Sequence, residues 1–157
     1  MKRLNGKAAI ITGATGGLGT AVTSVFLSEG AKVTANYRKD GDLEDVKGLI
    51  EEYGASLNMY KANVLNQAEI TAMAEDTVGK FGGIDILVNI VGGFAQAGIV
   101  ETDEGLWDKM VSLNMKSAFL NSKAVTPHMI ERKHGRIINI GARPAIKGAA
   151  GMLAYGA

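Results

Sequence analysis

The stretch Ala8–Gly19, AAIITGATGGLG, restricts the fold of this chain more than any other part of its sequence. A short apolar run leads into a glycine-rich turn, and a helical pattern follows. This order presents backbone N–H groups to a phosphate at the positive end of a helix dipole. Gly13 permits the sharp bend, and Gly19 lets the helix lie close to its strand. Gly16 or Gly17 would let the backbone approach a pyrophosphate. The stretch predicts a dinucleotide site, with a plain strand–helix turn as the alternative.

The composition of the chain is that of an ordinary globular domain. Its 157 residues suit one domain, and its contents of 46% hydrophobic and 21% charged residues are typical. A net charge of +1 gives no argument for binding nucleic acid or an acidic membrane surface. With no cysteine, the chain has no disulfide framework or thiolate zinc site, and its acidic residues show no metal-ligand spacing. No apolar run reaches membrane-spanning length, so we expect a cytoplasmic protein without metal, nucleic-acid or membrane partners.

Strand-like apolar runs alternate with helical patterns along the whole chain. The expected strands are residues 7–12, 32–37, 57–62, 84–91 and 137–140, and the expected helices are residues 18–29, 42–52, 67–81 and 103–132. The longest helix should loosen near Pro127, which has no backbone N–H to donate. The nearly all-apolar run at 84–91 is typical of a central parallel strand covered on both faces. The alternation predicts an α/β fold with a parallel, doubly wound sheet.

The spacing of the glycine turn points to a family that other parts of the chain also match. The sequence TGATGGLG at 12–19 resembles the TGxxxGxG fingerprint of the short-chain dehydrogenase/reductase family, whose members use NAD or NADP for hydride transfer. Further matches, in family order, are NIVGG at 89–93, Asn114 within the long helix, and Tyr155. The resemblance implies that the turn binds the cofactor through Gly13, Thr15, Gly16, Gly17, Leu18 and Gly19.

The resemblance also implies a Rossmann-type sheet, and such sheets usually have more strands than the five that are visible here. We therefore expect the C-terminal strands to be missing, and residues 1–157 to be the N-terminal portion of a longer, single NAD(P)-binding domain. The fifth strand should then lie at an exposed edge. Family members usually pair through the long helix, so residues 103–132 are the expected face of a homodimer or homotetramer.

The end of the second strand should select the cofactor. NAD enzymes place a carboxylate there to hold the ribose 2′-hydroxyl, whereas NADP enzymes use a basic group for the 2′-phosphate. The segment ANYRK at 35–39 has no acid, and its Arg38 can offer a bidentate fork to a phosphate. Thr15, however, stands where many NADP-preferring members carry a second basic residue. We expect NADP to be preferred and NAD to be accepted; solvated loop cations are the alternative.

Four further cofactor contacts follow from the resemblance. Asn63 and Val64 stand where family members usually have Asp-Val contacting the adenine, although a turn that caps the next helix would use the same residues. Asn89 and Gly92 match the outer positions of the family's Asn-Asn-Ala-Gly. There Asn89 would tie the central strand ends together, and Gly92 would leave room for the ribose and nicotinamide. An ordinary pair of glycines ending a strand is the alternative.

The resemblance places the chemistry at Tyr155 and Asn114. In the family's Tyr-x-x-x-Lys, the Tyr gives a proton to the substrate carbonyl and the Lys lowers the pKa of that Tyr; here the Lys would come after Ala157. Asn114 matches a catalytic Asn whose helix kink and carbonyl hold a water of the proton relay, and a surface Asn facing solvent is the alternative. Where the family has a Ser that steadies the oxyanion, this chain has Ala142.

The segment GARPAIKGAAGMLAYG at 141–156 resembles the active-site region of quinoid dihydropteridine reductases, which lack that Ser. Arg143 within it is a candidate substrate contact or a loop cation. The sequence thus predicts an NAD(P)H-dependent oxidoreductase that transfers hydride to or from a small carbonyl or imine-type substrate. An inactive NAD(P)-binding sensor or subunit is the alternative, which Ala142 favours and Tyr155 argues against. We expect the 157-residue chain by itself to have little activity.

Overall fold

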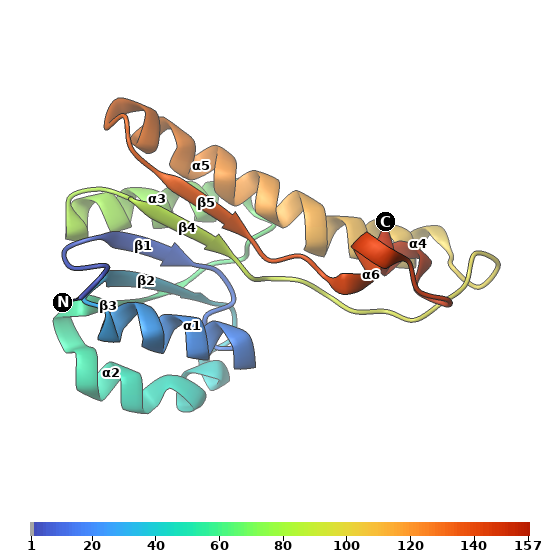
Figure 1. The fold of residues 1–157 in the computed structure, drawn as a ribbon, viewed down its shortest axis with the longest axis horizontal. Coiled ribbons are helices and arrows are strands. Elements are labelled where there is room, and N and C mark those ends of the chain that lie inside the picture. Colours follow the sequence, from blue (N-terminus) through green and yellow to red (C-terminus); the bar gives the residue numbers. More distant parts are fainter. Residues whose placement is uncertain (1) are drawn as a thin grey trace.

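The structure, a computed structural model, describes residues 2–157 and contains a five-stranded parallel sheet (Figure 1). Its strands are β1 (Ala8–Ile11), β2 (Lys32–Tyr37), β3 (Leu57–Lys61), β4 (Ile86–Asn89) and β5 (Arg136–Asn139). Their spatial order is β3-β2-β1-β4-β5, and every neighbouring pair runs parallel. The chain therefore builds the sheet outward from β1 in one direction and then continues on the other side of β1. This order confirms the predicted doubly wound fold, with its switch point between β1 and β4.

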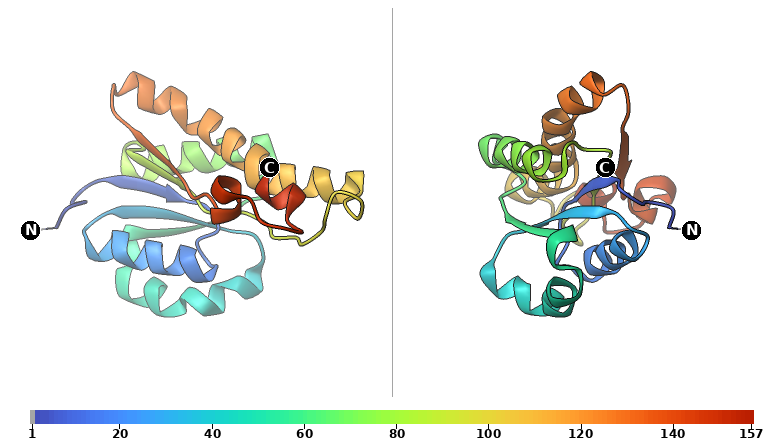
Figure 2. Two further views of the ribbon diagram at one scale, coloured as in Figure 1. Left: turned by 45° about the vertical axis from the view of Figure 1, so that its right-hand side comes forward. Right: turned by 90° about the vertical axis from the view of Figure 1, so that its left-hand side faces the viewer.

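Helices cover both faces of the sheet. They are α1 (Gly17–Ser28), α2 (Lys47–Tyr53), α3 (Gln67–Phe81), α4 (Glu104–Val111), α5 (Ser117–Glu131), α6 (Arg143–Lys147) and α7 (Leu153–Gly156), with short 3₁₀ helices at Asp40–Val46 and Gly54–Ser56. Figure 2 shows α1 and α2 on one side of the sheet and α3 and α5 on the other. Adjacent residues of β1 face the two layers, because Ile10 packs with α3 and α5 whereas Ile11 packs with α1. The apolar core is therefore divided in two by the sheet.

Local signals explain why α3 has the bounds that the sequence predicted. The Asn66 side chain accepts hydrogen bonds from the backbone N–H groups of Ala68 and Glu69, which caps the first turn. Gly82 ends the helix with a φ of 82°, a left-handed conformation that glycine adopts without strain. The helix predicted at 42–52 differs, since it begins as a 3₁₀ helix and becomes α-helical only over α2.

The long helix predicted over 103–132 is not one α-helix. A π-helical turn, Ser112–Lys116, separates α4 from α5. Helix α5 continues through Pro127 without a break. Pro127 has no N–H to donate, so the Lys123 carbonyl loses its helical hydrogen bond. Both residues are exposed, and water can donate to that carbonyl instead. The interruption therefore lies around Asn114 and not at the proline.

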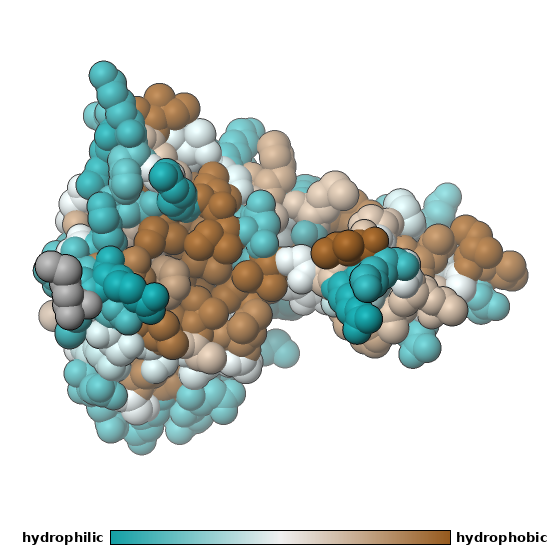
Figure 3. Space-filling view, viewed as in Figure 1, coloured by the Kyte–Doolittle hydropathy of each residue, from teal (hydrophilic) through white to brown (hydrophobic). Residues whose placement is uncertain are grey.

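Strand β5 lies at the edge of the sheet, as expected, and its residues are exposed. An apolar groove of about 360 Å³ runs between this edge and α1. Its apolar lining residues are Leu4, Val25, Phe26, Ile86 and Ile138. Figure 3 shows apolar surface gathered over this part of the molecule. The edge is thus exposed both in its backbone and in its side chains.

Candidate functional site

The loop between β1 and α1 is held in a tight turn. Gly13 has a φ of 64°, in the left-handed region, and its carbonyl accepts a hydrogen bond from the Gly16 N–H at 3.1 Å. A Cβ atom on Gly19 would overlap the Gly13 carbonyl oxygen and lie 2.8 Å from the Ala14 Cα. Gly17, in contrast, has open space around it. Gly13 and Gly19 therefore shape the turn, and Gly17 leaves the outer face of the turn open.

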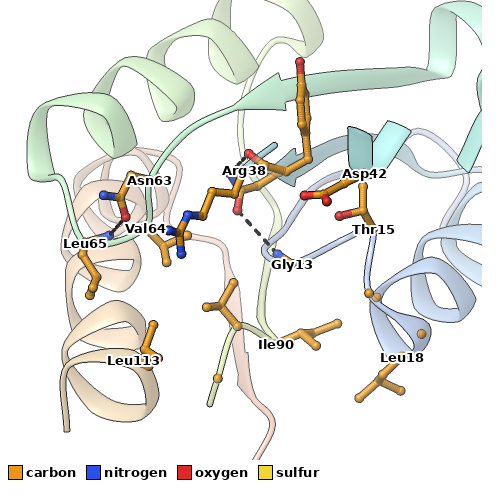
Figure 4. Close-up of a pocket in the computed structure, with 17 residues that line it drawn as sticks. Gly13, Thr15, Leu18, Arg38, Asp42, Asn63, Val64, Leu65, Ile90 and Leu113 are labelled. Atoms are coloured by element: carbon orange, nitrogen blue, oxygen red, sulfur yellow. Dashed lines mark hydrogen bonds between the residues drawn. The ribbon is translucent and has the colours of Figure 1, made fainter. Parts of the chain in front are cut away.

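This loop forms one wall of a pocket of about 390 Å³ at the carboxyl ends of the strands. Among the residues predicted to bind a cofactor, those that line this first pocket are Gly13, Thr15, Gly16, Gly17, Leu18, Gly19, Arg38, Asn63, Val64 and Gly92. Figure 4 shows the lining residues converging from the loops that follow different strands and from two helical segments, which carry Leu18 and Leu113. The pocket lies at the switch point of the sheet, where doubly wound folds bind their ligands.

Sequence reasoning missed the other residues that line the first pocket, which are Asn36, Tyr37, Asp42, Leu65, Ile90, Val91 and Leu113. Asn36 is the most constrained of them and is 2% exposed. Its Oδ1 accepts from the Gly13 N–H at 3.4 Å, and its Nδ2 donates to the Ala62 carbonyl at 2.9 Å. The side chain thereby joins the end of β2 to the glycine turn and to the end of β3. An Asn inside a strand is uncommon, and that signal could have identified it.

Two oppositely charged residues line the first pocket beyond β2. Arg38 follows the strand directly, and Figure 4 shows its side chain crossing the pocket toward Val64 and Asn63. Asp42 belongs to the 3₁₀ helix that follows and lies near Thr15 (Figure 4). The end of β2 lacks an acidic residue, as the sequence shows, but the 3₁₀ helix that follows brings Asp42 into the first pocket.

Asn63 forms a turn and does not cap α3. Its Oδ1 accepts from the Leu65 N–H at 3.0 Å, and its own backbone N–H donates to Glu69 Oε2 at 2.7 Å. The residue that caps α3 is Asn66. The turn holds Asn63 and Val64 in the pocket wall, opposite the glycine turn (Figure 4).

Asn89 does not line the first pocket. Its side chain is buried, and its Nδ2 donates to Asn139 Oδ1 at 2.9 Å and lies 3.5 Å from Ser122 Oγ. These contacts hold the end of β4 to β5 and to α5. A direct contact between Asn89 and a cofactor stays a prediction, and the geometry shows a side chain that positions strand ends.

A second cavity, of about 420 Å³, contains both residues predicted to be catalytic. It is lined by Ile90, Val91, Gly92, Gly93, Phe94, Asn114, Ile140, Gly141, Ala142, Ala145, Tyr155 and Ala157. The ring of Tyr155 meets that of Phe94 edge-on, with centres 5.0 Å apart and planes at 78°. Ala142, which has no hydroxyl, lines the same cavity. Among the described residues that line the second cavity, Tyr155 is therefore the one with a hydroxyl group.

The Asn114 side chain is bonded to the backbone of Gly93 and does not simply face solvent. Its Oδ1 accepts from the Gly93 N–H at 2.8 Å, and its Nδ2 donates to the Gly93 carbonyl at 3.1 Å. A Cβ atom on Gly92 would lie 2.7 Å from Asn114 Oδ1, so this glycine permits the contact. Asn114 belongs to the π-helical turn Ser112–Lys116, and such turns are frequent at functional sites.

Arg143 does not line the cavity of Tyr155. It begins α6 and lines a separate groove with Lys147 and Met152, which favours a surface cation over a substrate contact. Within residues 2–157, no group of three or more His, Asp or Glu side chains is arranged to hold a metal ion. The same part of the chain has no helix that is both long and apolar enough to cross a membrane.

The fold and the first pocket together define a class of protein. A doubly wound parallel sheet with a glycine turn after its first strand and a pocket at its switch point is the architecture of a dinucleotide-binding domain. The chain belongs to the short chain dehydrogenase family, whose sequence model matches residues 7–157.

Three curated relatives show how far the likeness extends. The 3-oxoacyl-(acyl-carrier-protein) reductase FabG of Thermotoga maritima is 35% identical over 155 residues, which are 99% of this chain and 63% of that protein. The NADP-dependent 3-hydroxy acid dehydrogenase YdfG of Escherichia coli is 36% identical over 151 residues, 94% of this chain and 59% of that protein. Nodulation protein G of a Rhizobium species is 32% identical over 155 residues, 99% of this chain and 62% of that protein. The chain thus spans about three fifths of the length of these relatives.

Proposed function

We propose that the protein is an NAD(P)-dependent oxidoreductase that transfers hydride to or from a small carbonyl or imine-type substrate. The observation that carries this proposal is that the two cavities share Ile90, Val91 and Gly92 and therefore meet at the end of β4. A dinucleotide with its pyrophosphate on the glycine turn would extend through this junction toward Tyr155. Relatives named as a reductase and a dehydrogenase support the same class of reaction, and they give no support to an inactive binding protein.

The residues around the first pocket fit a dinucleotide, and we infer that residues 1–157 belong to a single NAD(P)-binding Rossmann domain. Gly17 leaves room for a pyrophosphate, and the positive end of the α1 dipole lies behind the turn. Arg38 supplies a cation for a 2′-phosphate, which supports a preference for NADP, and the E. coli relative is named as NADP-dependent. The nicotinamide of the bound cofactor would supply or accept the hydride.

The residues of the second cavity would orient the substrate and move a proton. Tyr155 would give the proton from its phenol oxygen, and the edge-on contact with Phe94 restricts the orientation of its ring. Asn114 fixes the loop after β4 through Gly93 and supports a role for the π-helical turn in the proton relay. With Ala142 in place of a Ser, the reacting oxygen or nitrogen of the substrate would depend on Tyr155 for a hydrogen bond.

The α4–α5 segment is our proposed face for a homodimer or homotetramer. Four large apolar side chains are exposed along it, since Trp107, Met115, Phe119 and Ile130 are 40%, 61%, 60% and 69% exposed. Exposed apolar residues that gather on one segment mark association surfaces. Light scattering coupled to size-exclusion chromatography should show a dimer or larger species, and Phe119→Asp should shift it toward the monomer. A monomeric wild type would contradict this part of the proposal.

Tyr155→Phe tests the proposed chemistry, because it removes the phenol oxygen and keeps the ring against Phe94. NADPH fluorescence measures binding, and the loss of NADPH absorbance with a panel of ketones and quinonoid pterins measures turnover by the full gene product. We expect NADPH affinity within about twofold of wild type and a fall in turnover of at least about 100-fold. Tyr60→Phe, on β3 and outside the lining of both cavities, is the matched control and should leave both values unchanged. Full turnover by Tyr155→Phe, or a wild type that binds NADPH and reduces no substrate in the panel, would overturn the proposal.

A further inference from the structure

The first pocket contains one acid and one base at the end that would hold the adenosine ribose. Among the described residues that line it, Arg38 and Asp42 are the two with a formal charge. The Arg38 side chain crosses toward Val64, whereas the Asp42 carboxylate lies near Thr15 (Figure 4). We propose that Asp42 opposes Arg38 and keeps this pocket able to bind NAD(H) as well as NADP(H). This inference rests on the proposed function, and it names the residue that sets the cofactor ratio.

The position of Asp42 is fixed by the turn that contains it. Its Oδ2 accepts from the Lys39 N–H at 3.0 Å, and its own N–H donates to the Lys39 carbonyl at 3.0 Å. These bonds hold it at the start of the 3₁₀ helix Asp40–Val46. One carboxylate oxygen is thus used by the fold, and the other remains to accept a hydrogen bond from a ribose hydroxyl. Asp42 is therefore positioned before any ligand arrives.

The other acid of this turn acts elsewhere. The Asp40 carboxylate is paired with the Lys61 ammonium at 2.7 Å, and it does not line the first pocket. The Asp40 side chain is also 72% exposed, so solvent screens its charge from a ligand in the pocket. Asp40 and Asp42 lie two residues apart and carry the same charge, but Asp42 alone of the two faces the nucleotide site. This difference supplies a matched control.

The two cofactors differ at the atom that these charges would reach. A 2′-phosphate carries up to about two negative charges at neutral pH, whereas a 2′-hydroxyl is neutral and can donate a hydrogen bond. Arg38 attracts the phosphate, and Asp42 repels it while accepting from the hydroxyl. Near the protein surface the effective dielectric is high, so each charge changes affinity moderately and does not exclude either cofactor. A pocket with both charges therefore binds both cofactors, and their ratio depends on Asp42.

The test compares Asp42→Asn with Asp40→Asn. Both substitutions remove one negative charge from the same turn, and in Asp42→Asn the amide oxygen of the new side chain can still accept from the Lys39 N–H. Dissociation constants for NADPH and NADH are measured by nucleotide fluorescence, at low and at high salt. We expect Asp42→Asn to raise the ratio of NADPH to NADH affinity by about three- to tenfold at low salt and by less at high salt. Asp40→Asn should change that ratio by less than about twofold.

The outcomes separate this inference from the proposed function. If the wild type binds neither nucleotide, the proposed function fails and this inference fails with it. If the wild type binds them and Asp42→Asn changes the ratio no more than Asp40→Asn does, this inference alone is overturned. Asp42→Ser also keeps an acceptor for the Lys39 N–H and loses the charge, so it serves as a second variant if Asp42→Asn folds poorly. An equal ratio in the serine variant and the wild type would likewise overturn the inference.

Discussion

Replacing Gly19 by Ala should weaken both the fold and nucleotide binding through one steric conflict. The added Cβ would overlap the Gly13 carbonyl oxygen and lie 2.8 Å from the Ala14 Cα. Both neighbours are backbone atoms of the glycine turn, so no side chain can rotate away to make room. Either α1 must move from β1, or the turn that would hold the pyrophosphate must open.

The magnitude follows from two opposing terms. Forcing an extra methyl group into a packed site costs about 1–3 kcal/mol, and the upper half of that range applies where backbone must shift. Alanine returns up to about 1 kcal/mol through its higher helix propensity, because Gly19 lies within α1. The net loss in free energy of unfolding should be about 2 kcal/mol, which in a chain of this size lowers Tm by about 4–8 °C.

Urea unfolding followed by circular dichroism measures the stability change, and NADPH fluorescence measures binding. Gly79→Ala is the matched control, because Gly79 lies inside α3 with no atom near the added Cβ. That control should gain up to about 1 kcal/mol and bind NADPH as the wild type does. We expect Gly19→Ala to lose at least about tenfold in affinity, since the turn must move. Equal stability of the two variants, together with unchanged NADPH affinity in Gly19→Ala, would refute this reasoning.

Three further substitutions test other contacts. Asn114→Ala removes both hydrogen bonds to Gly93, and because these bonds are exposed to water the free energy of unfolding should fall by only about 0.5–1.5 kcal/mol in urea titrations. Asp85 is buried and accepts a hydrogen bond from the first backbone N–H of β1 at 2.9 Å; Asp85→Ala leaves that donor unsatisfied and should cost about 3 kcal/mol in the same assay. Hydrogen bonds from the Arg3 backbone and side chain lower the pKa of the Glu29 carboxyl below its ordinary value. Because the folded-state pKa is depressed, Glu29 contributes to the free energy of unfolding at neutral pH, and this contribution is lost as pH falls through the folded-state pKa. Glu29→Gln should therefore reduce stability at neutral pH and not in strong acid.

The parts of the fold that the sequence predicts well are those with local signals at both ends. The strand at 32–37 and the helix at 67–81 have the predicted bounds, and Asn66 and Gly82 mark the ends of the helix. The strand predicted at 84–91 is shorter in the structure, because β4 ends where pairing with its neighbours ends. Strand length is decided by partners far away in sequence, which a local pattern does not contain.

The residues of the candidate site also differ in whether a local sequence signal predicts them. The glycine turn and Arg38 are recognised because each lies within a short motif whose chemistry is local. Asp42 and Leu113 reach the first pocket only because a 3₁₀ helix and a π-helical turn bring them there. The tip of β2 has no acid, and the chain supplies one a turn later. Irregular helices of this kind depend on tertiary contacts, such as the one between Asn114 and Gly93, that no spacing rule predicts.

Two asparagine side chains hold glycines of the site through hydrogen bonds to the backbone. Glycine loses more conformational entropy on folding than any other residue, so a wall built of glycines needs other groups to hold it. An amide side chain both donates and accepts, and it can therefore satisfy a backbone N–H and a carbonyl together. Asn114 does this for Gly93, and Asn36 holds Gly13 to the end of β3. The fold itself thus holds Gly13 at the first pocket and Gly93 at the second cavity, so we expect a nucleotide to bind without first ordering these two positions.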